Sequence, residues 1–136
     1  MPTNLVNRAA NAYAATERTT ESGLITDAIV LEKAAFMLED LKGDLESEDW
    51  EDVIKYNQLI WTVIQAEMME NKPSPMLTPQ IRANLMSLSI YVDKRTLELL
   101  YNRERYPQDI QSLININRNI ALGLRGNPGT GVPLEE

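Results

Sequence analysis

Cysteine and histidine are both absent from the 136 residues of this sequence. Without cysteine there are no disulfides, thiol nucleophiles or sulfur-ligated metals. Without histidine the chain also lacks the commonest general base and metal ligand, so histidine–zinc sites and serine triads are excluded. We therefore expect a non-enzymatic protein with no metal site and no cofactor.

Long hydrophobic runs are missing as well. The longest is AAFML, far short of the ~20 apolar residues that span a bilayer. The first residues, MPTNLVNRAANAYAAT, lack the apolar segment of a secretory signal. We expect a soluble, intracellular protein that does not enter a membrane.

Aromatic residues are scarce at 6 %, so aliphatic side chains must supply most of the core. The net charge is −7, and such a molecule repels phosphate backbones as a whole. Direct nucleic-acid binding is therefore not expected. A local basic patch formed by Lys94, Arg95, Arg103 and Arg105 remains an alternative.

The apolar residues of the sequence recur mainly at the spacing of an α-helix. The spacing of apolar residues predicts helices over residues 23–43, 47–71, 79–105 and 107–124, which indicates an all-α helical bundle. Residues 1–21 are ambiguous, and a short alanine-rich N-terminal helix is one interpretation of them.

Local signals predict where these helices begin and end. Gly43 is a stop, Ser47 and Thr78 are N-cap residues, and Pro79 and Pro107 suit the first helical position. We expect a single helical domain over residues 1–125. Glycine and proline predict a flexible tail over residues 126–136.

Each predicted helix has one apolar stripe at a period of about 100° per residue. The four stripes contain Leu24, Ala28, Leu31, Ala35 and Leu38; Trp50, Ile54, Trp61, Ile64 and Met68; Ile81, Leu85, Leu88, Val92 and Leu99; and Leu113, Ile116, Ile120 and Leu124. Three of them are interrupted by polar residues, namely Asn57, Asn84 and Arg95, and Asn117. Because an unpaired buried amide costs about 1–3 kcal/mol, we expect these side chains to form a structural polar network between helices. The alternative is that they line a binding groove.

Two helices also carry apolar residues away from their main stripe. These are Tyr56, Leu59 and Val63 in the second helix and Met86, Ile90, Leu97 and Tyr101 in the third. A helix that is apolar on two faces is either central in a bundle or presents a face to a partner. We predict a partner-binding surface here; coverage by residues 1–21 and a homo-oligomer interface remain open alternatives.

Three segments together resemble one protein family. They are YNQLIWTVI (56–64), TPQIRANLMSLSIYVDKRT (78–96) and LININRNIALGL (113–124), and the weaker AYAATERTTES (12–22) precedes them. In their order and separation they are similar to the FlaF family of bacterial flagellar biosynthesis proteins, over roughly residues 12–125. One departure is Tyr91, where the family pattern has tryptophan.

The resemblance implies a cytoplasmic, non-enzymatic protein that binds flagellin as a secretion chaperone and influences flagellin synthesis. It also implies a link to a second regulator, FlbT. The alternative function is that of a post-transcriptional regulator of flagellin messenger RNA acting with FlbT.

Overall fold

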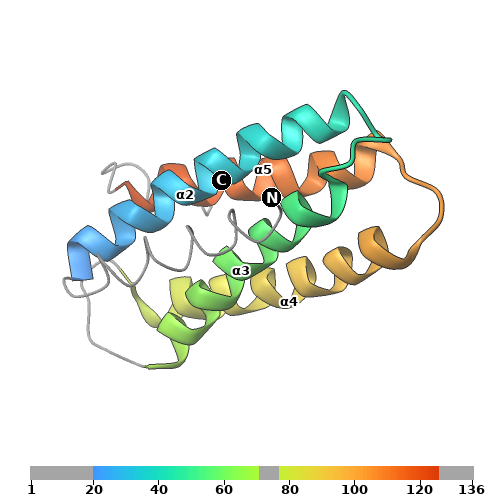
Figure 1. Cartoon of the computed structure of the whole chain (residues 1–136). Helices are drawn as coiled ribbons and strands as arrows, with labels where there is room; N and C mark the ends of the chain where they lie inside the picture. The colour runs from blue at the N-terminus through green and yellow to red at the C-terminus, as the bar shows by residue number, and fades with distance from the viewer. Residues whose placement is uncertain (1–19, 71–76, 126–136) are drawn as a thin grey trace.

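The computed structural model describes residues 20–70 and 77–125, with side chains from Leu24 onward. These residues form four helices and no strand: α2 (Thr20–Lys42), α3 (Trp50–Met69), α4 (Pro79–Tyr101) and α5 (Pro107–Leu124) (Figure 1). The predicted all-α helical bundle is confirmed. The expected N-terminal helix and the expected flexible tail lie outside the described residues.

Helix α4 begins where the capping signals predict. The Thr78 side-chain oxygen accepts a hydrogen bond from the Ile81 backbone N–H at 3.2 Å, and Pro79 occupies the first turn. This bond satisfies one of the backbone donors that a helix start leaves unpaired. Pro107 likewise occupies the first turn of α5, although Tyr106 before it provides no side-chain cap, and α2 ends immediately before Gly43.

The start of α3 differs from the prediction. Ser47 is not its N-cap, because the Ser47 hydroxyl accepts a hydrogen bond from the Asp49 backbone N–H within the preceding turn. The helix begins at Trp50, and Asp49 provides no side-chain cap. The first turn still carries Glu51 and Asp52, whose negative charge the helix dipole favours.

The end of α4 also differs from the prediction. The helix stops at Tyr101 rather than near residue 105, and Asn102 has an extended backbone. Arg105 then lies over the Trp50 ring, with 4.3 Å between the guanidinium carbon and the ring centroid, and donates a hydrogen bond to the Leu45 carbonyl at 2.6 Å. These contacts place the α4–α5 connection against the start of α3, which a continued helix would not allow.

The helices run alternately up and down. Antiparallel packing of α2 on α5 is the most extensive contact between helices, followed by that of α3 on α4 and that of α2 on α3, and α4 touches α5 only slightly (Figure 1). One hydrogen bond shows that α3 and α4 are antiparallel. Trp50 at the start of α3 donates its indole N–H to the Leu99 carbonyl near the end of α4. At the opposite end of this pair, Arg82 donates to the Met68 carbonyl.

The core is mainly aliphatic. Every predicted inward residue of α2 and α3 is buried, and so are the central residues of α4 and α5. Burying each such side chain stabilises the fold by about 1.5–3 kcal/mol. Ile81, Leu88 and Ile116 are only half-buried and pack against the rim of this core.

Two absences hold for the part of the chain that the structure describes. No helix in it combines the length and the hydrophobicity that crossing a bilayer requires. The same residues contain no cluster of acidic side chains with a geometry suited to holding a metal ion.

Candidate functional site

A buried amide network joins three of the helices. The Asn117 side-chain N–H₂ donates to the Asn57 amide oxygen at 2.6 Å and to the Leu31 carbonyl at 3.4 Å. The Trp61 indole N–H donates to the Asn117 amide oxygen at 2.9 Å. All of these side chains are inaccessible to solvent, so α5 is connected to both α2 and α3 through one amide.

The Asn57 amide is less completely bonded than that of Asn117. Its oxygen accepts from Asn117, but its nitrogen makes no hydrogen bond with any described residue although it is buried. A buried donor without an acceptor is destabilising. Asn117 is therefore the centre of the network, and Asn57 is one of its ends.

The structure does not bring Asn84 into this network. Asn84 lies at the edge of the α4 stripe and is half-buried. Its amide oxygen accepts a hydrogen bond from Gln80, one turn earlier, at 3.0 Å.

Arg95 also lies apart from the amides, where α4 approaches α5. Its side chain is 27 % exposed and pairs with Glu98 at 2.7 Å and with Asp109 at 3.7 Å. It also donates to the Tyr91 hydroxyl, and that hydroxyl donates to Ser112 on α5. Hydrogen bonds to Ser112 and Arg95 lower the pKa of Tyr91. The charge of Arg95, which lies within the predicted apolar stripe, thus takes part in polar contacts between α4 and α5 at the surface of the bundle.

The seven residues of the predicted partner surface fall into three groups. Tyr56 is buried, at 3 % exposure, and belongs to the core. Leu59, Val63 and Met86 are half-buried and pack against the core. The remaining three residues, all on α4, are exposed: Ile90 by 60 %, Leu97 by 52 % and Tyr101 by 79 %.

We call Met86, Ile90, Leu97 and Tyr101 the α4 face. Their spacing of four, seven and four residues places them along one side of the helix. A run of large apolar side chains on one exposed helix face is typical of an interaction surface rather than of the random scatter that every protein shows.

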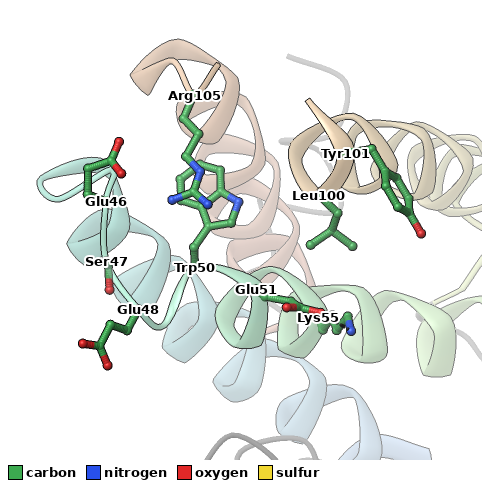
Figure 2. A pocket seen from close by; sticks show the side chains of 9 residues that line it. All are labelled: Glu46, Ser47, Glu48, Trp50, Glu51, Lys55, Leu100, Tyr101 and Arg105. Atoms are coloured by element: carbon green, nitrogen blue, oxygen red, sulfur yellow. Dashed lines mark hydrogen bonds and ion pairs between the residues drawn. The ribbon is translucent and has the colours of Figure 1, made fainter. Parts of the chain in front are cut away.

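The α4 face ends at a pocket of about 430 Å³ (Figure 2). The pocket is formed where the α2–α3 connection meets the end of α4 and the residues after it. It is lined by Glu46, Ser47, Glu48, Trp50, Glu51, Lys55, Leu100, Tyr101 and Arg105. Tyr101 therefore belongs both to the α4 face and to the pocket wall.

The pocket is more acidic than basic. Lys55 is paired with Glu51 at 2.6 Å, which lowers the pKa of Glu51 and raises that of Lys55. Glu46 and Glu48 make no ion pair with a described residue, and in Figure 2 the Glu48 carboxylate points away from the Trp50 ring. Three glutamates thus face one lysine and one arginine, which favours a partner carrying positive charge.

The prediction from the sequence did not include two features of the surface. The pocket depends on the stacking of Arg105 on Trp50, and no sequence spacing indicates a contact between residues 55 positions apart. A second set of exposed apolar side chains, Ile25, Ile29 and Phe36 on α2 and Leu122 on α5, was also overlooked. Their spacing on α2 would have revealed them.

The fold and these surfaces define a small all-α bundle that exposes an apolar helix face beside an acidic pocket. Comparison with protein families identifies the family: the model described as flagellar protein FlaF matches residues 9–124. The chain therefore belongs to the FlaF family and is a flagellar protein, which confirms the resemblance carried by the three sequence segments. No curated protein and no solved structure matches the chain significantly.

Proposed function

We propose that this FlaF-family protein binds flagellin as a secretion chaperone and that the α4 face is the binding surface. The observation that carries the proposal is the exposure of Ile90, Leu97 and Tyr101 along one side of a long helix. The family places the chain among flagellar proteins. Flagellin awaiting export has amphipathic terminal segments, and an amphipathic helix docks its apolar side on such a surface.

The chemistry of the α4 face suits a helix better than a rigid, polar partner. Met86 is half-buried at its start and can adapt to different side chains because the thioether is flexible. Leu59 and Val63 are half-buried on the neighbouring helix α3, where they keep part of their apolar surface exposed. The buried aromatic and aliphatic contacts then supply the affinity, as at most interfaces.

The pocket adds a polar end to this surface. A segment lying along α4 reaches the pocket at Tyr101, where Glu46 and Glu48 have no charged partner among the described residues. A basic side chain or the positive N-terminal end of a bound helix fits this position. The pocket thus favours one orientation of the bound segment.

The proposal is tested by co-expressing the chain with flagellin and separating the products by size-exclusion chromatography. We expect the two proteins to co-elute, and the Ile90→Asp variant to reduce the affinity by at least about tenfold, as for a central interface residue. Ile29→Asp is the matched control, because Ile29 on α2 is similarly exposed, at 50 %. It should leave flagellin binding unchanged.

Circular dichroism separates loss of binding from loss of folding. Ile90→Asp should keep the helical signal of the parent protein, because Ile90 is exposed. Unfolding of this variant would place Ile90 in the core and contradict the proposal. Equal loss of flagellin by Ile29→Asp would show that the α4 face is not the binding surface.

The effect on flagellin synthesis is proposed to follow from flagellin binding and from FlbT rather than from direct contact with RNA. Two residues of the predicted basic patch are engaged elsewhere, since Arg95 pairs with Glu98 and Arg105 stacks on Trp50. Lys94 and Arg103 alone provide little positive charge for binding a phosphate backbone. A salt-sensitive shift of flagellin leader RNA by this protein alone would contradict this part of the proposal.

A further inference from the structure

A second apolar surface lies on α2 and α5, which we call the α2 face. It consists of Ile25, Ile29, Phe36 and Leu122, and Phe36 is 67 % exposed. Helix α2 packs on α5 and α3, and α4 packs on α3 (Figure 1). The α2 face is therefore separate from the α4 face, and one partner helix lying on α4 does not cover it.

Two ion pairs join α2 and α5 within this surface, one before Phe36 and one after it along α2. Glu32 binds Arg125 through both carboxylate oxygens, with 2.8 Å between Oε2 and the Arg125 Nε, and Glu39 lies 3.9 Å from Arg118. Phe36 falls between Glu32 and Glu39 in α2. Leu122 similarly falls between Arg118 and Arg125 in α5, so the ion pairs join the exposed apolar residues of both helices into one surface.

The α2 face is locally neutral in a chain whose net charge is −7. Among the residues whose side chains the structure describes, its charged ones are three acidic and three basic: Glu32, Glu39 and Asp40, and Lys33, Arg118 and Arg125. Two copies of an acidic protein repel each other at most orientations. A neutral apolar face is where a second copy can approach with the least repulsion.

The sequence of the α2 face is complementary to itself. Positions 29 and 36 carry large apolar residues, and positions 32 and 33 between them carry Glu32 and Lys33. If two copies of α2 cross antiparallel about a two-fold axis between these charges, Ile29 of each copy meets Phe36 of the other. The same axis brings Glu32 of each copy beside Lys33 of the other.

We propose that the α2 face is a homodimer interface in which a second copy of this chain packs antiparallel through α2. The interface is isologous, as two-fold symmetry requires, and positions 29, 32, 33 and 36 each meet a complementary residue in that one arrangement. Lys33 makes no ion pair within the described part of its own chain, so its charge is available to the second copy. Glu32 retains lone pairs beyond those bonded to Arg125.

The interface is small, with four apolar side chains from each copy rather than the 20–30 residues of a typical stable one, which buries about 800 Å² per partner. Self-association should therefore be weak and should depend on protein concentration. Leaving the α4 face free allows each copy to bind its own partner.

The test measures the mass of the full chain by analytical ultracentrifugation over a concentration series. We expect a monomer–dimer equilibrium, and we expect Phe36→Asp to raise the dimer dissociation constant at least about tenfold. Ile90→Asp, on the α4 face, is the matched control and should dimerise like the parent protein. A parent protein that is monomeric at every concentration would overturn the proposal, and so would dimerisation unaffected by Phe36→Asp.

Charge reversal tests the antiparallel arrangement itself. Lys33→Glu alone and Glu32→Lys alone should each weaken dimerisation, because each places like charges across the two-fold axis. An equimolar mixture of the two variants should form a heterodimer, because two acidic side chains at positions 32 and 33 of one copy then face two basic side chains at the same positions of the other. Failure of the mixture to associate more tightly than either variant would overturn the antiparallel interface.

Two other occupants of the α2 face give distinct results. If the parent protein is monomeric and Phe36→Asp loses flagellin, the face belongs to flagellin. If removing residues 1–19 creates a dimer that the full chain does not form, those residues cover the face. Either result would overturn the homodimer.

Discussion

The centre of the bundle and the α4 face depart from the usual distribution of residues in opposite ways. In the centre, polar amides lie among apolar side chains, and Asn117 is fully buried. On α4, the apolar side chains of Ile90, Leu97 and Tyr101 lie in water. The amides find partners within the chain, whereas the exposed residues have no such partners among the described ones.

The buried amides and the exposed apolar residues affect different properties of the protein. A buried amide without a partner is costly, so the network favours the one arrangement of α2, α3 and α5 that satisfies it. An exposed apolar side chain changes the stability of the monomer little, but it contributes to affinity once a partner covers it. Changes in the centre should therefore reduce stability, and changes on the α4 face should reduce binding.

The largest stability effect is expected at Tyr56, and Tyr101 provides the contrast. Both belong to the predicted partner surface, but Tyr56 is 3 % exposed and Tyr101 is 79 % exposed. Tyr56→Ala should lower the free energy of unfolding by about 3–5 kcal/mol, the range for removing a buried aromatic ring. Tyr101→Ala should change it by less than about 0.5 kcal/mol. Urea denaturation followed by circular dichroism measures both, and equal effects would remove the distinction between the two surfaces.

A somewhat smaller loss is expected for Asn117→Leu. The substitution leaves the Trp61 N–H and the Asn57 oxygen without partners, which should lower the free energy of unfolding by about 2–4 kcal/mol. The helical content should remain, while loosened packing should broaden the NMR spectrum. Asn84→Leu is the matched control, because among the described residues its amide bonds to Gln80 on the surface of the same helix. A sharp spectrum and unchanged stability for Asn117→Leu would show that the network does not select the packing.

Asn57→Leu should be milder than Asn117→Leu. It breaks one hydrogen bond of Asn117, but it also removes a buried nitrogen that has no acceptor among the described residues. We expect a loss of less than about 2 kcal/mol in the same denaturation experiment. The reverse order of the two variants would contradict the placement of Asn117 at the centre of the network.

Alkaline pH should destabilise the protein through Tyr56. Burial raises the pKa of this phenol above its usual value of 10.0, so the folded state holds its proton more tightly than the unfolded state does. The stabilisation is fully present below the unfolded pKa and is lost as the pH rises through the folded pKa. Urea midpoints measured above pH 10 should therefore fall more steeply for the parent protein than for Tyr56→Phe. Parallel pH profiles would contradict a protonated, buried Tyr56.

The smallest effect is expected at the ion pair between Glu32 and Arg125. The hydrogen bond from Arg125 lowers the pKa of Glu32 below 4.5, so the contribution is present above that pH and is lost as the pH falls through the folded pKa. The pair is exposed and screened by salt, which limits its contribution. Glu32→Gln should make the urea midpoint slightly less sensitive to acid than that of the parent protein. An unchanged acid profile would show that the pair adds nothing to stability.

The sequence predicts the architecture well because the apolar stripes are regular. The stripe of α2 is buried throughout, and Thr78 caps α4 through its own side chain, so period and capping chemistry were sufficient there. Ser47 has the same capping chemistry but bonds within a turn, and α4 ends early because Arg105 stacks on Trp50. The first outcome is a local choice between two bonds that the same hydroxyl can accept, and the second involves a tertiary contact that local sequence does not encode.

The candidate site was less predictable than the fold. A helical wheel shows that Tyr56 and Tyr101 both lie away from the main stripes, but not that α4 covers one side of α3 while the outer side of α4 is left open. The same limit applies to the asparagines, since Asn84 and Asn117 occupy similar stripes and only Asn117 faces another helix. Which face meets a neighbour is a property of the packed bundle.

Methyl NMR can detect flagellin binding at the α4 face residue by residue. The chain is labelled at its isoleucine, leucine and methionine methyl groups and titrated with flagellin. We expect shifts at Met86, Ile90 and Leu97, while Ile25 and Ile29 on the α2 face remain unchanged. Shifts confined to the α2 face, or none at saturating flagellin, would contradict flagellin binding by the α4 face.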